Sequence, residues 1–240
     1  MPLLLLKRLI RQTFNRKGFQ IVPLAQHPPS NFMGLPALGI QTIFDIGANV
    51  GQFATRIHQI LPAASIDSFE PLGDAFASLQ ATFAREGIRG RCHNFALGDE
   101  ERSATIHRHV AHSPSSSLLS TTSHHEGLDH RTREQHDETI QLKRLDDTVR
   151  DLKINIAPEL FIKMDVQGFE DKVIDGGRQT FARAKAVLTE INLDSLYEGQ
   201  ADFGALCQRL FGLGFRYAGN FDQWQDTDGH VVAVDALFLR

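Results

Sequence analysis

Four acidic residues are placed where they could bind one ligand together. Each ends or follows a short apolar segment with the pattern of a buried strand, and they are Asp45, Glu70, Asp165 and Glu190. In an open parallel sheet, ligands bind beyond the carboxyl ends of the strands, near the point where the strand order reverses. The four carboxylates are therefore predicted to share one rim of a sheet, where they can accept hydrogen bonds from a ligand.

The most specific single motif is Asp45-Ile-Gly-Ala-Asn-Val-Gly51. Its glycines allow the backbone to turn sharply and to approach a ligand closely, and the spacing is not the G-x-G-x-x-G of dinucleotide folds. An acidic side chain before the first glycine would bind an amine more readily than a pyrophosphate. The N-terminus of the helix that follows would bind an anion such as a carboxylate. Glu70 can accept hydrogen bonds from both hydroxyls of a ribose. Amine, carboxylate and ribose occur together in S-adenosylmethionine.

The elements that would position these residues alternate between strands and helices. The expected strands are 42–46, 65–69, 91–95, 161–164 and 186–189, with 215–217 and 231–239 as a closing antiparallel pair, and the expected helices are 52–61, 74–86, 169–181 and 203–213. This alternation is typical of an α/β domain with a mostly parallel, doubly wound sheet.

An insertion at about 98–159 separates the third and fourth of these strands. Within it, segments 103–110 and 139–145 alternate like strands that pair, and the whole insertion is expected to form a lid over the ligand site. Seven of the 11 histidines lie between residues 107 and 136. Such density permits divalent metal binding, but a solvated, mobile loop is the simpler interpretation, and no metal site is expected.

Composition and charge fit a globular domain with a basic appendage. Of 240 residues, 42% are hydrophobic and 22% charged, and two cysteines are too few for a disulfide framework. Residues 1–40 are expected to form a basic helix and a Pro-rich connector, and 41–240 a single domain. Residues 1–44 hold five basic and no acidic residues, whereas the remainder holds 20 basic and 29 acidic residues. This acidic body disfavours binding to nucleic acid.

The N-terminal helix has two interpretations. Its apolar residues share one helical face, which favours packing on the domain but also suits weak, reversible contact of residues 1–17 with an anionic membrane surface. The run from Leu3 to Leu6 is too short to span a bilayer. Because basic residues follow this run, the order is wrong for a secretory signal, and a cytoplasmic protein is expected.

Five motifs occur in an order that resembles the FkbM family of class I S-adenosylmethionine-dependent methyltransferases. They are Asp45-x-Gly-x-Asn-x-Gly51, Glu70-Pro71, Asn94-Phe-Ala-Leu-Gly-Asp99, Arg144-Leu-Asp-Asp147 and Ile162-Lys-Met-Asp-Val-Gln-Gly-Phe-Glu170. The resemblance implies a Rossmann-like fold with a seven-stranded, mostly parallel sheet of order 3-2-1-4-5-7-6, strand 7 antiparallel, and helices on both faces. The activity it implies is methyl transfer from S-adenosylmethionine, commonly to an oxygen of a sugar or other small-molecule acceptor.

The resemblance also implies roles for individual residues. The implied cofactor-binding residues are Asp45, Gly47, Asn49, Gly51, Glu70, Pro71, Asn94, Ala96, Leu97 and Asp165. Lys163, Asp165 and Glu170 are the catalytic candidates, and Asp165 is the preferred base because its position faces the methyl group. The family usually has Glu where this chain has Gln167, which removes one carboxylate.

Several alternatives to these roles remain open at this point. Lys163 could serve only in an ion pair at the sheet rim, Glu170 could favour its helix dipole, and Asp146 and Asp147 could cap a helix. The alternative functions are a non-catalytic cofactor-binding scaffold, favoured by Gln167, and an NAD-dependent oxidoreductase, disfavoured by the glycine spacing.

Overall fold

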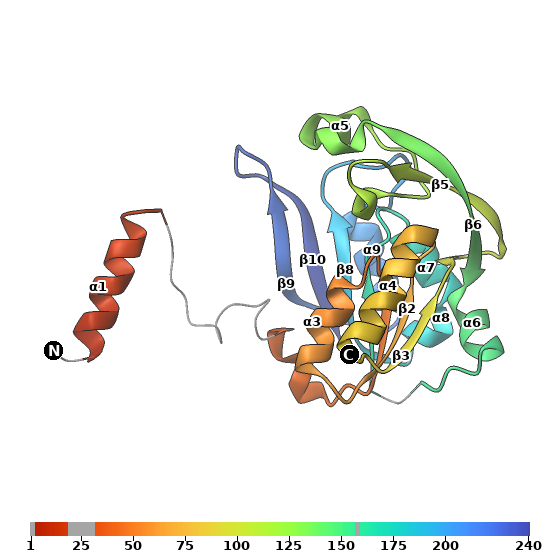
Figure 1. The fold of residues 1–240 in the computed structure, drawn as a ribbon, viewed down its shortest axis with the longest axis horizontal. Coiled ribbons are helices and arrows are strands. Elements are labelled where there is room, and N and C mark those ends of the chain that lie inside the picture. The colour runs from red at the N-terminus through yellow and green to blue at the C-terminus, as the bar shows by residue number, and fades with distance from the viewer. Residues whose placement is uncertain (1–2, 19–31, 157–158) are drawn as a thin grey trace.

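A seven-stranded sheet forms the centre of the molecule (Figure 1). The computed structural model describes residues 3–18, 32–156 and 159–240. The strands of this sheet are β1 (Thr42–Ile46), β2 (Ser65–Phe69), β3 (Gly90–His93), β7 (Leu160–Met164), β8 (Ala184–Asn192), β9 (Arg216–Gln225) and β10 (Val231–Leu239). Their order is β3-β2-β1-β7-β8-β10-β9, and β10 runs antiparallel to both neighbours. Counted along the chain within this sheet, the order is 3-2-1-4-5-7-6, which confirms the predicted fold.

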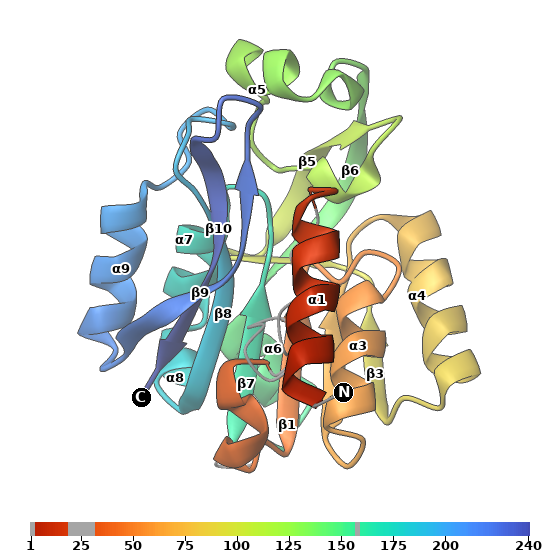
Figure 2. The ribbon, with the colours of Figure 1, turned by 90° about the vertical axis from the view of Figure 1, so that its left-hand side faces the viewer.

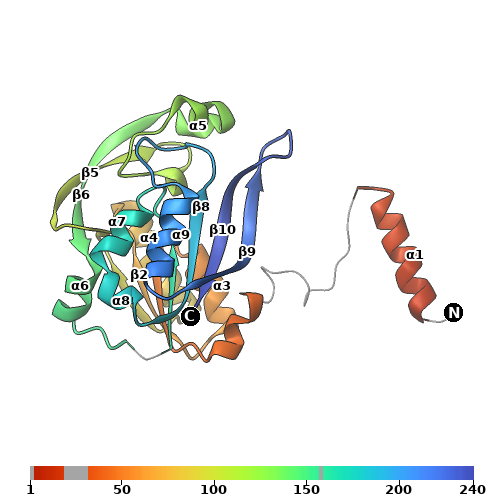
Figure 3. The same ribbon diagram turned by 180° about the vertical axis from the view of Figure 1, so that it is seen from behind.

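Helices cover both faces of the sheet (Figures 1 and 3). One face carries α3 (Gln52–Ile60) and α4 (Gly73–Glu86), and the other carries α6 (Leu145–Asp151), α7 (Glu170–Gly176), α8 (Arg178–Phe181) and α9 (Phe203–Gly212). Successive strand side chains point to opposite faces, so Ile43 joins the core under α3 while Phe44 joins the core on the other face. Each such buried side chain contributes roughly 1.5–3 kcal/mol to folding.

The single helix predicted at 169–181 is wrong, because it breaks at Gly177 into α7 and α8. A Cβ at Gly176 would lie 1.8 Å from the carbonyl oxygen of Gly98, so this turn packs directly on another backbone. Asp146 accepts hydrogen bonds from the backbone N–H groups of Gln179 and Thr180, at 3.0 and 2.8 Å. The acid therefore caps the first turn of α8 from a distant part of the chain.

The insertion folds into a small sheet with short helices. Its strands β4 (Ala96–Gly98), β5 (Arg102–His109) and β6 (Gln135–Arg144) lie in the order β4-β6-β5. Between β5 and β6 come 3-10 turns at Ser113–Ser115 and His130–Thr132 and the helix α5 (Ser123–Leu128). The predicted pairing of β5 with β6 is confirmed, and the structure shows that it is antiparallel. Strand β4 was not predicted. The insertion lies at one end of the main sheet (Figure 2).

The N-terminal segment forms the predicted helix, α1 (Leu3–Asn15), and a 3-10 helix, η2 (Phe32–Leu38), precedes β1. Ile10 and Phe14 of α1 are 42% and 46% exposed. Most of the predicted Pro-rich connector lies outside the described residues. None of the described helices combines the length and apolar character needed to cross a bilayer.

Candidate active site

A cavity of about 360 Å³ opens at the carboxyl edge of the main sheet, beneath the insertion. The predicted site residues in its wall are Gly47, Asn49, Glu70, Pro71, Ala96, Leu97, Lys163 and Asp165. Ser113, Ser116 and Ser117 of the insertion also line the cavity. The strand order reverses between β1 and β7, where ligand sites of open α/β sheets occur. Asp45, Gly51, Asn94 and Glu170 are absent from the wall and lie behind it.

The turn after β1 depends on a glycine for its position. Gly47 has a φ of +77°, and a Cβ there would lie 1.9 Å from the backbone oxygen of Asp165. The N–H groups of Gly47 and Ala48 both donate to the carbonyl of Phe69 at 3.0 Å. The ends of β1, β2 and β7 are therefore locked together. Gly51, with a φ of +92°, begins α3 against Leu79 and supports this turn from outside the cavity.

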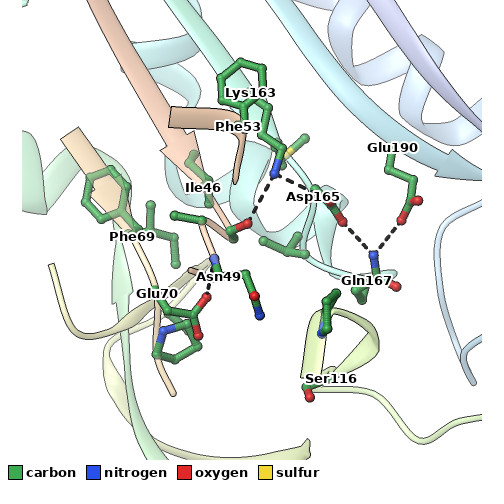
Figure 4. Close-up of a pocket in the computed structure, with 18 of the residues that line it drawn as sticks. Ile46, Asn49, Phe53, Phe69, Glu70, Ser116, Lys163, Asp165, Gln167 and Glu190 are labelled. Atoms are coloured by element: carbon green, nitrogen blue, oxygen red, sulfur yellow. Dashed lines mark hydrogen bonds and ion pairs between the residues drawn. The ribbon is translucent and has the colours of Figure 1, made fainter. Parts of the chain in front are cut away.

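Glu70 links the turns that follow β1 and β2. Its Oε2 accepts a hydrogen bond from the N–H of Asn49 at 2.8 Å (Figure 4), and its Oε1 accepts one from the N–H of Leu72 at 2.9 Å. Burial raises the pKa of Glu70 to about 7. Asn94 donates to the carbonyls of Glu70 and Pro71, both at 3.0 Å. Asn94 thus holds the turn that carries Glu70 and does not line the cavity itself.

Lys163 lies at the centre of an ion-pair group. Its Nζ is 3.6 Å from Asp45 Oδ1 and 3.4 Å from Asp165 Oδ2, and it donates to the carbonyl of Gly47 at 3.2 Å. Burial acts to lower the pKa of Lys163, but the charges of Asp165 and Asp45 outweigh it and raise this pKa above its usual value. Lys163 therefore stays protonated at neutral pH and holds Asp165 in place. This geometry favours the ion-pair role.

Asp45 lies behind the cavity wall. Its side chain is fully buried, and its Oδ2 accepts a hydrogen bond from the Ser68 hydroxyl at 3.3 Å. Burial raises the pKa of Asp45, and the charge of Lys163 opposes this shift. Asp45 therefore acts on the cavity only through its ion pair with Lys163. In this geometry Asp45 does not contact the amine of a ligand directly.

Gln167 separates two carboxylates and fixes their positions. Its Nε2 donates to Asp165 Oδ1 and to Glu190 Oε2, both at 2.6 Å (Figure 4). Its Oε1 accepts a hydrogen bond from the Tyr197 hydroxyl at 2.6 Å, which sets the orientation of the amide. The Asp165 side chain is 35% exposed, whereas burial raises the pKa of Glu190 well above its usual range. Asp165 is thus the carboxyl group presented to a ligand, whereas burial disfavours the charged form of Glu190.

The Gln167–Tyr197 contact was not predicted. Tyr197 follows Gln167 by 30 residues, and its hydroxyl oxygen also lies 2.9 Å from the carbonyl oxygen of Ser115 in the insertion. The backbone oxygen of Gln167 accepts from the Ser117 hydroxyl at 2.6 Å. The insertion is therefore fastened directly to the turn that carries Asp165. Gln167 adopts a left-handed φ of +57° within this network.

Glu170 faces the loop rather than the cavity. Its Oε1 accepts hydrogen bonds from the N–H groups of Val166 and Gly168, at 3.0 and 3.3 Å, and burial raises its pKa to about 7. The side chain is 4% exposed. We infer that Glu170 is a positioning residue for the loop after β7, in place of the catalytic role expected from the sequence.

Substitution of Glu170 tests this role. Glu170→Ala leaves two buried N–H groups without an acceptor and is expected to lower the free energy of unfolding by about 1–3 kcal/mol. Glu170→Gln keeps one carbonyl oxygen for both donors and should cost much less. Urea denaturation of the two variants measures the difference. Equal stability of both variants, with methyl transfer lost in Glu170→Gln, would support the catalytic role instead.

The interpretation of the histidine-rich segment as a solvated loop is wrong. His109 and His125 are 0% and 2% exposed, and His109 contacts the carbonyl of Ser115 and the hydroxyl of Thr121, both at 2.9 Å. Burial lowers the pKa of His125 to about 4. These histidines form the interior of the insertion. Among the described residues, the one group with metal-binding spacing is Asp226, Asp228 and His230 on the exposed β9–β10 hairpin.

Comparisons with known proteins agree with this architecture. Residues 45–217 match the family model described as the methyltransferase FkbM domain. The 2-O-methyltransferase NoeI of Sinorhizobium fredii is 29% identical over 175 residues, which cover 70% of each chain. The 31-O-demethyl-FK506 methyltransferase FkbM of Streptomyces tacrolimicus is 26% identical over 216 residues, or 80% of this chain and 79% of that one.

A solved structure shows the same fold. Methyltransferase FkbM from Methylobacillus flagellatus superimposes with a TM-score of 0.53 and 15% sequence identity, and the match covers 84% of this chain and 44% of the solved one. The family model spans more than half of this chain and includes the glycine turn, Glu70 and the Asp165 loop. The chain therefore belongs to the FkbM methyltransferase domain family, and it is a methyltransferase.

Proposed function

We propose that this protein transfers a methyl group from S-adenosylmethionine to a hydroxyl oxygen of a sugar or similar neutral acceptor. The observation that carries the proposal is a single cavity with Glu70 at the β2 end and Asp165 beside β7. The names of both relatives specify methyl transfer to oxygen, which supports the same reaction type here. An acidic cavity wall gives no track for a phosphate backbone.

The β1–β2 end of the cavity fits S-adenosylmethionine, which supplies a methyl group already activated on its sulfonium. Each carboxylate oxygen of Glu70 accepts one hydrogen bond from a backbone N–H group. A second lone pair on each oxygen is therefore available to accept a hydrogen bond from a ribose hydroxyl. Gly47 and Asn49 would line the methionine end, and Ala96 and Leu97 would form the apolar side for adenine. These residues come from the turns after β1 and β2 and from strand β4.

The β7–β8 end would bind the acceptor. Asp165 is held by Lys163 on one oxygen and by Gln167 on the other, so its orientation is fixed before a ligand arrives. Its free lone pairs can accept the proton of an acceptor hydroxyl, and a positioned base contributes about 10²- to 10⁴-fold to rate. Alignment of the reactants is the larger effect and contributes roughly 7–11 kcal/mol. Because Gln167 leaves Asp165 accessible, its presence does not favour a non-catalytic scaffold.

The experiment that tests this function follows a labelled methyl group. The full chain is incubated with [methyl-³H]S-adenosylmethionine and with separated neutral-glycan, RNA and protein fractions of a cell extract. We expect protein-dependent label in the neutral-glycan fraction. Label confined to RNA or protein, or no transfer to any fraction, would reject the proposal. Binding of a nicotinamide cofactor in place of S-adenosylmethionine would support the oxidoreductase alternative.

The affinity for S-adenosylmethionine is expected to fall as the pH is lowered. Glu70 in the free protein is protonated below a pKa of about 7, and acceptance of two ribose hydroxyls favours its charged form. Binding must then release this proton, so affinity at pH 6 should be roughly tenfold weaker than at pH 8. Titration calorimetry at both pH values measures the change. Glu70→Gln should remove most of this pH dependence, and an unchanged dependence in that variant would contradict the assignment.

Unfolding does not account for the expected loss of affinity. The folded, unliganded protein holds the Glu70 proton more tightly than the unfolded chain, whose pKa is near 4.5. This contribution to stability is therefore complete below about pH 4.5 and is lost as the pH rises to about 7. Lowering the pH from 8 to 6 thus stabilises the free fold through Glu70 while weakening the binding of S-adenosylmethionine.

A further inference from the structure

A second cavity, of about 350 Å³, adjoins the candidate active site. Glu190 and Asp235 line both cavities, so the two share a wall. The rest of the second cavity is lined by Asp222, Gln223, Trp224, Ala233 and Val234, all from β9 and β10. A ligand that reaches Asp165 can therefore extend past Glu190 onto the surface of these strands.

The second cavity contains a row of three carboxylates. Asp235 of β10 lies directly opposite Glu190 of β8 and also opposite Asp222 of β9. Like charges directly opposite each other destabilise a sheet, and the positive charges of Lys163 and Arg56 oppose this effect at Asp235. Costly polar arrangements of this kind are typical of ligand sites.

The ligand that suits the row is neutral. Burial and the charge of Asp165 raise the pKa of Asp235 to about 6, and burial raises that of Glu190 further above its usual range. Burial therefore disfavours the charged form of Glu190, whose carboxyl group can exchange hydrogen bonds with the hydroxyl groups of a neutral ligand. Among the described residues, these three acids do not form a group with metal-binding spacing.

An aromatic side chain completes the second cavity. Trp224 is the single tryptophan of the chain and is 38% exposed. It follows Asp222 by two residues on β9, which places both on the same face of the strand. Its ring lies 6.3 Å from that of His125 in the insertion. A sugar ring can place its C–H face on an aromatic ring, whose face is electron-rich, and direct its hydroxyls to neighbouring carboxylates.

We propose that the second cavity is a saccharide subsite, so that the acceptor is a neutral glycan of at least two units. One unit would place the methylated hydroxyl beside Asp165, and a neighbouring unit would pack on Trp224 with its hydroxyls toward Asp222 and Asp235. This inference rests on the proposed function, because it takes the acceptor to be rich in hydroxyls. It adds the size of the acceptor and the residues that select it.

Tryptophan fluorescence tests the subsite directly, because all of the signal comes from Trp224. The full chain, saturated with S-adenosylhomocysteine, is titrated with neutral saccharides of one to six units. We expect a saturable change in emission with at least one saccharide of two or more units, and a dissociation constant at least about tenfold lower than for its monosaccharide. No saturable change with any saccharide, equal affinity for the monosaccharide, or a response to spermidine alone would overturn the proposal.

Variants locate the binding on β9. Asp222→Asn keeps the fluorophore and should weaken saccharide binding by about threefold to tenfold. The matched control is Asp228→Asn on the same hairpin, outside both cavities, which should bind like the wild type. Equal effects of the two substitutions would overturn the proposal. S-adenosylmethionine binding is measured in the same samples: if it persists while no saccharide binds, the subsite fails and the proposed function stands, whereas its absence rejects both.

Discussion

Gly47→Ala is expected to abolish binding of S-adenosylmethionine and to lower the free energy of unfolding by roughly 2–6 kcal/mol. The added Cβ would lie 1.9 Å from the backbone oxygen of Asp165, and the φ of +77° is one that alanine adopts only under strain. The turn after β1 must then move away from the end of β7. This displaces Asn49, which donates to Glu70, and so disrupts the cavity wall on two sides.

A second glycine provides the control for this substitution. Gly127 lies in α5, and a Cβ there would meet nothing within 4 Å. Gly127→Ala should therefore be neutral or stabilise the protein by up to about 1 kcal/mol, as in other helices. Urea denaturation gives both stabilities, and calorimetry below the unfolding transition gives both affinities. Wild-type affinity in a folded Gly47→Ala protein would show that the turn does not form the binding wall.

Asp165→Asn is expected to slow methyl transfer by about 10²- to 10⁴-fold while affinity for S-adenosylmethionine stays close to that of the wild type. The amide occupies the same volume and can still accept a hydrogen bond from Gln167, but it cannot take a proton. A fall in kcat without loss of cofactor binding is the result of removing a group that acts only in the transition state.

The measurement is transfer of label to the neutral-glycan fraction that the wild type modifies. Asp151→Asn, at a side chain that is 62% exposed on the far end of α6, serves as the control and should retain full activity. Retention of wild-type rates by Asp165→Asn would show that proton removal does not depend on Asp165.

The strands and the positions of the strand-end residues could be predicted because they depend on local patterns. Apolar runs such as Thr42–Ile46 become buried strands, and parallel strands present their carboxyl ends at one edge. Gly47, Glu70 and Asp165 therefore lie close together at this edge of the sheet, however the helices between the strands pack. The strand order came from the family resemblance, since periodicity alone does not order a parallel sheet.

The features that were missed depend on contacts between distant parts of the chain. The break between α7 and α8 follows from packing of Gly176 on Gly98, and the orientation of Gln167 follows from Tyr197. The segment around His109 reads as a solvated loop because it is polar, yet Ser115 and Thr121 satisfy its imidazole in the interior. Asp165 and Glu170 belong to the same motif, so the motif did not distinguish their roles. Only the structure shows that Asp165 lines the cavity and that Glu170 faces the loop.

Titration calorimetry with S-adenosylmethionine at pH 8 tests the central claim most directly. The account predicts saturable binding to the wild-type chain and to Glu101→Ala, an exposed control. It predicts at least about tenfold weaker binding to Glu70→Ala, because the ribose loses its acceptor. Absence of binding to the folded wild type, or equal affinity in Glu70→Ala, would contradict the account.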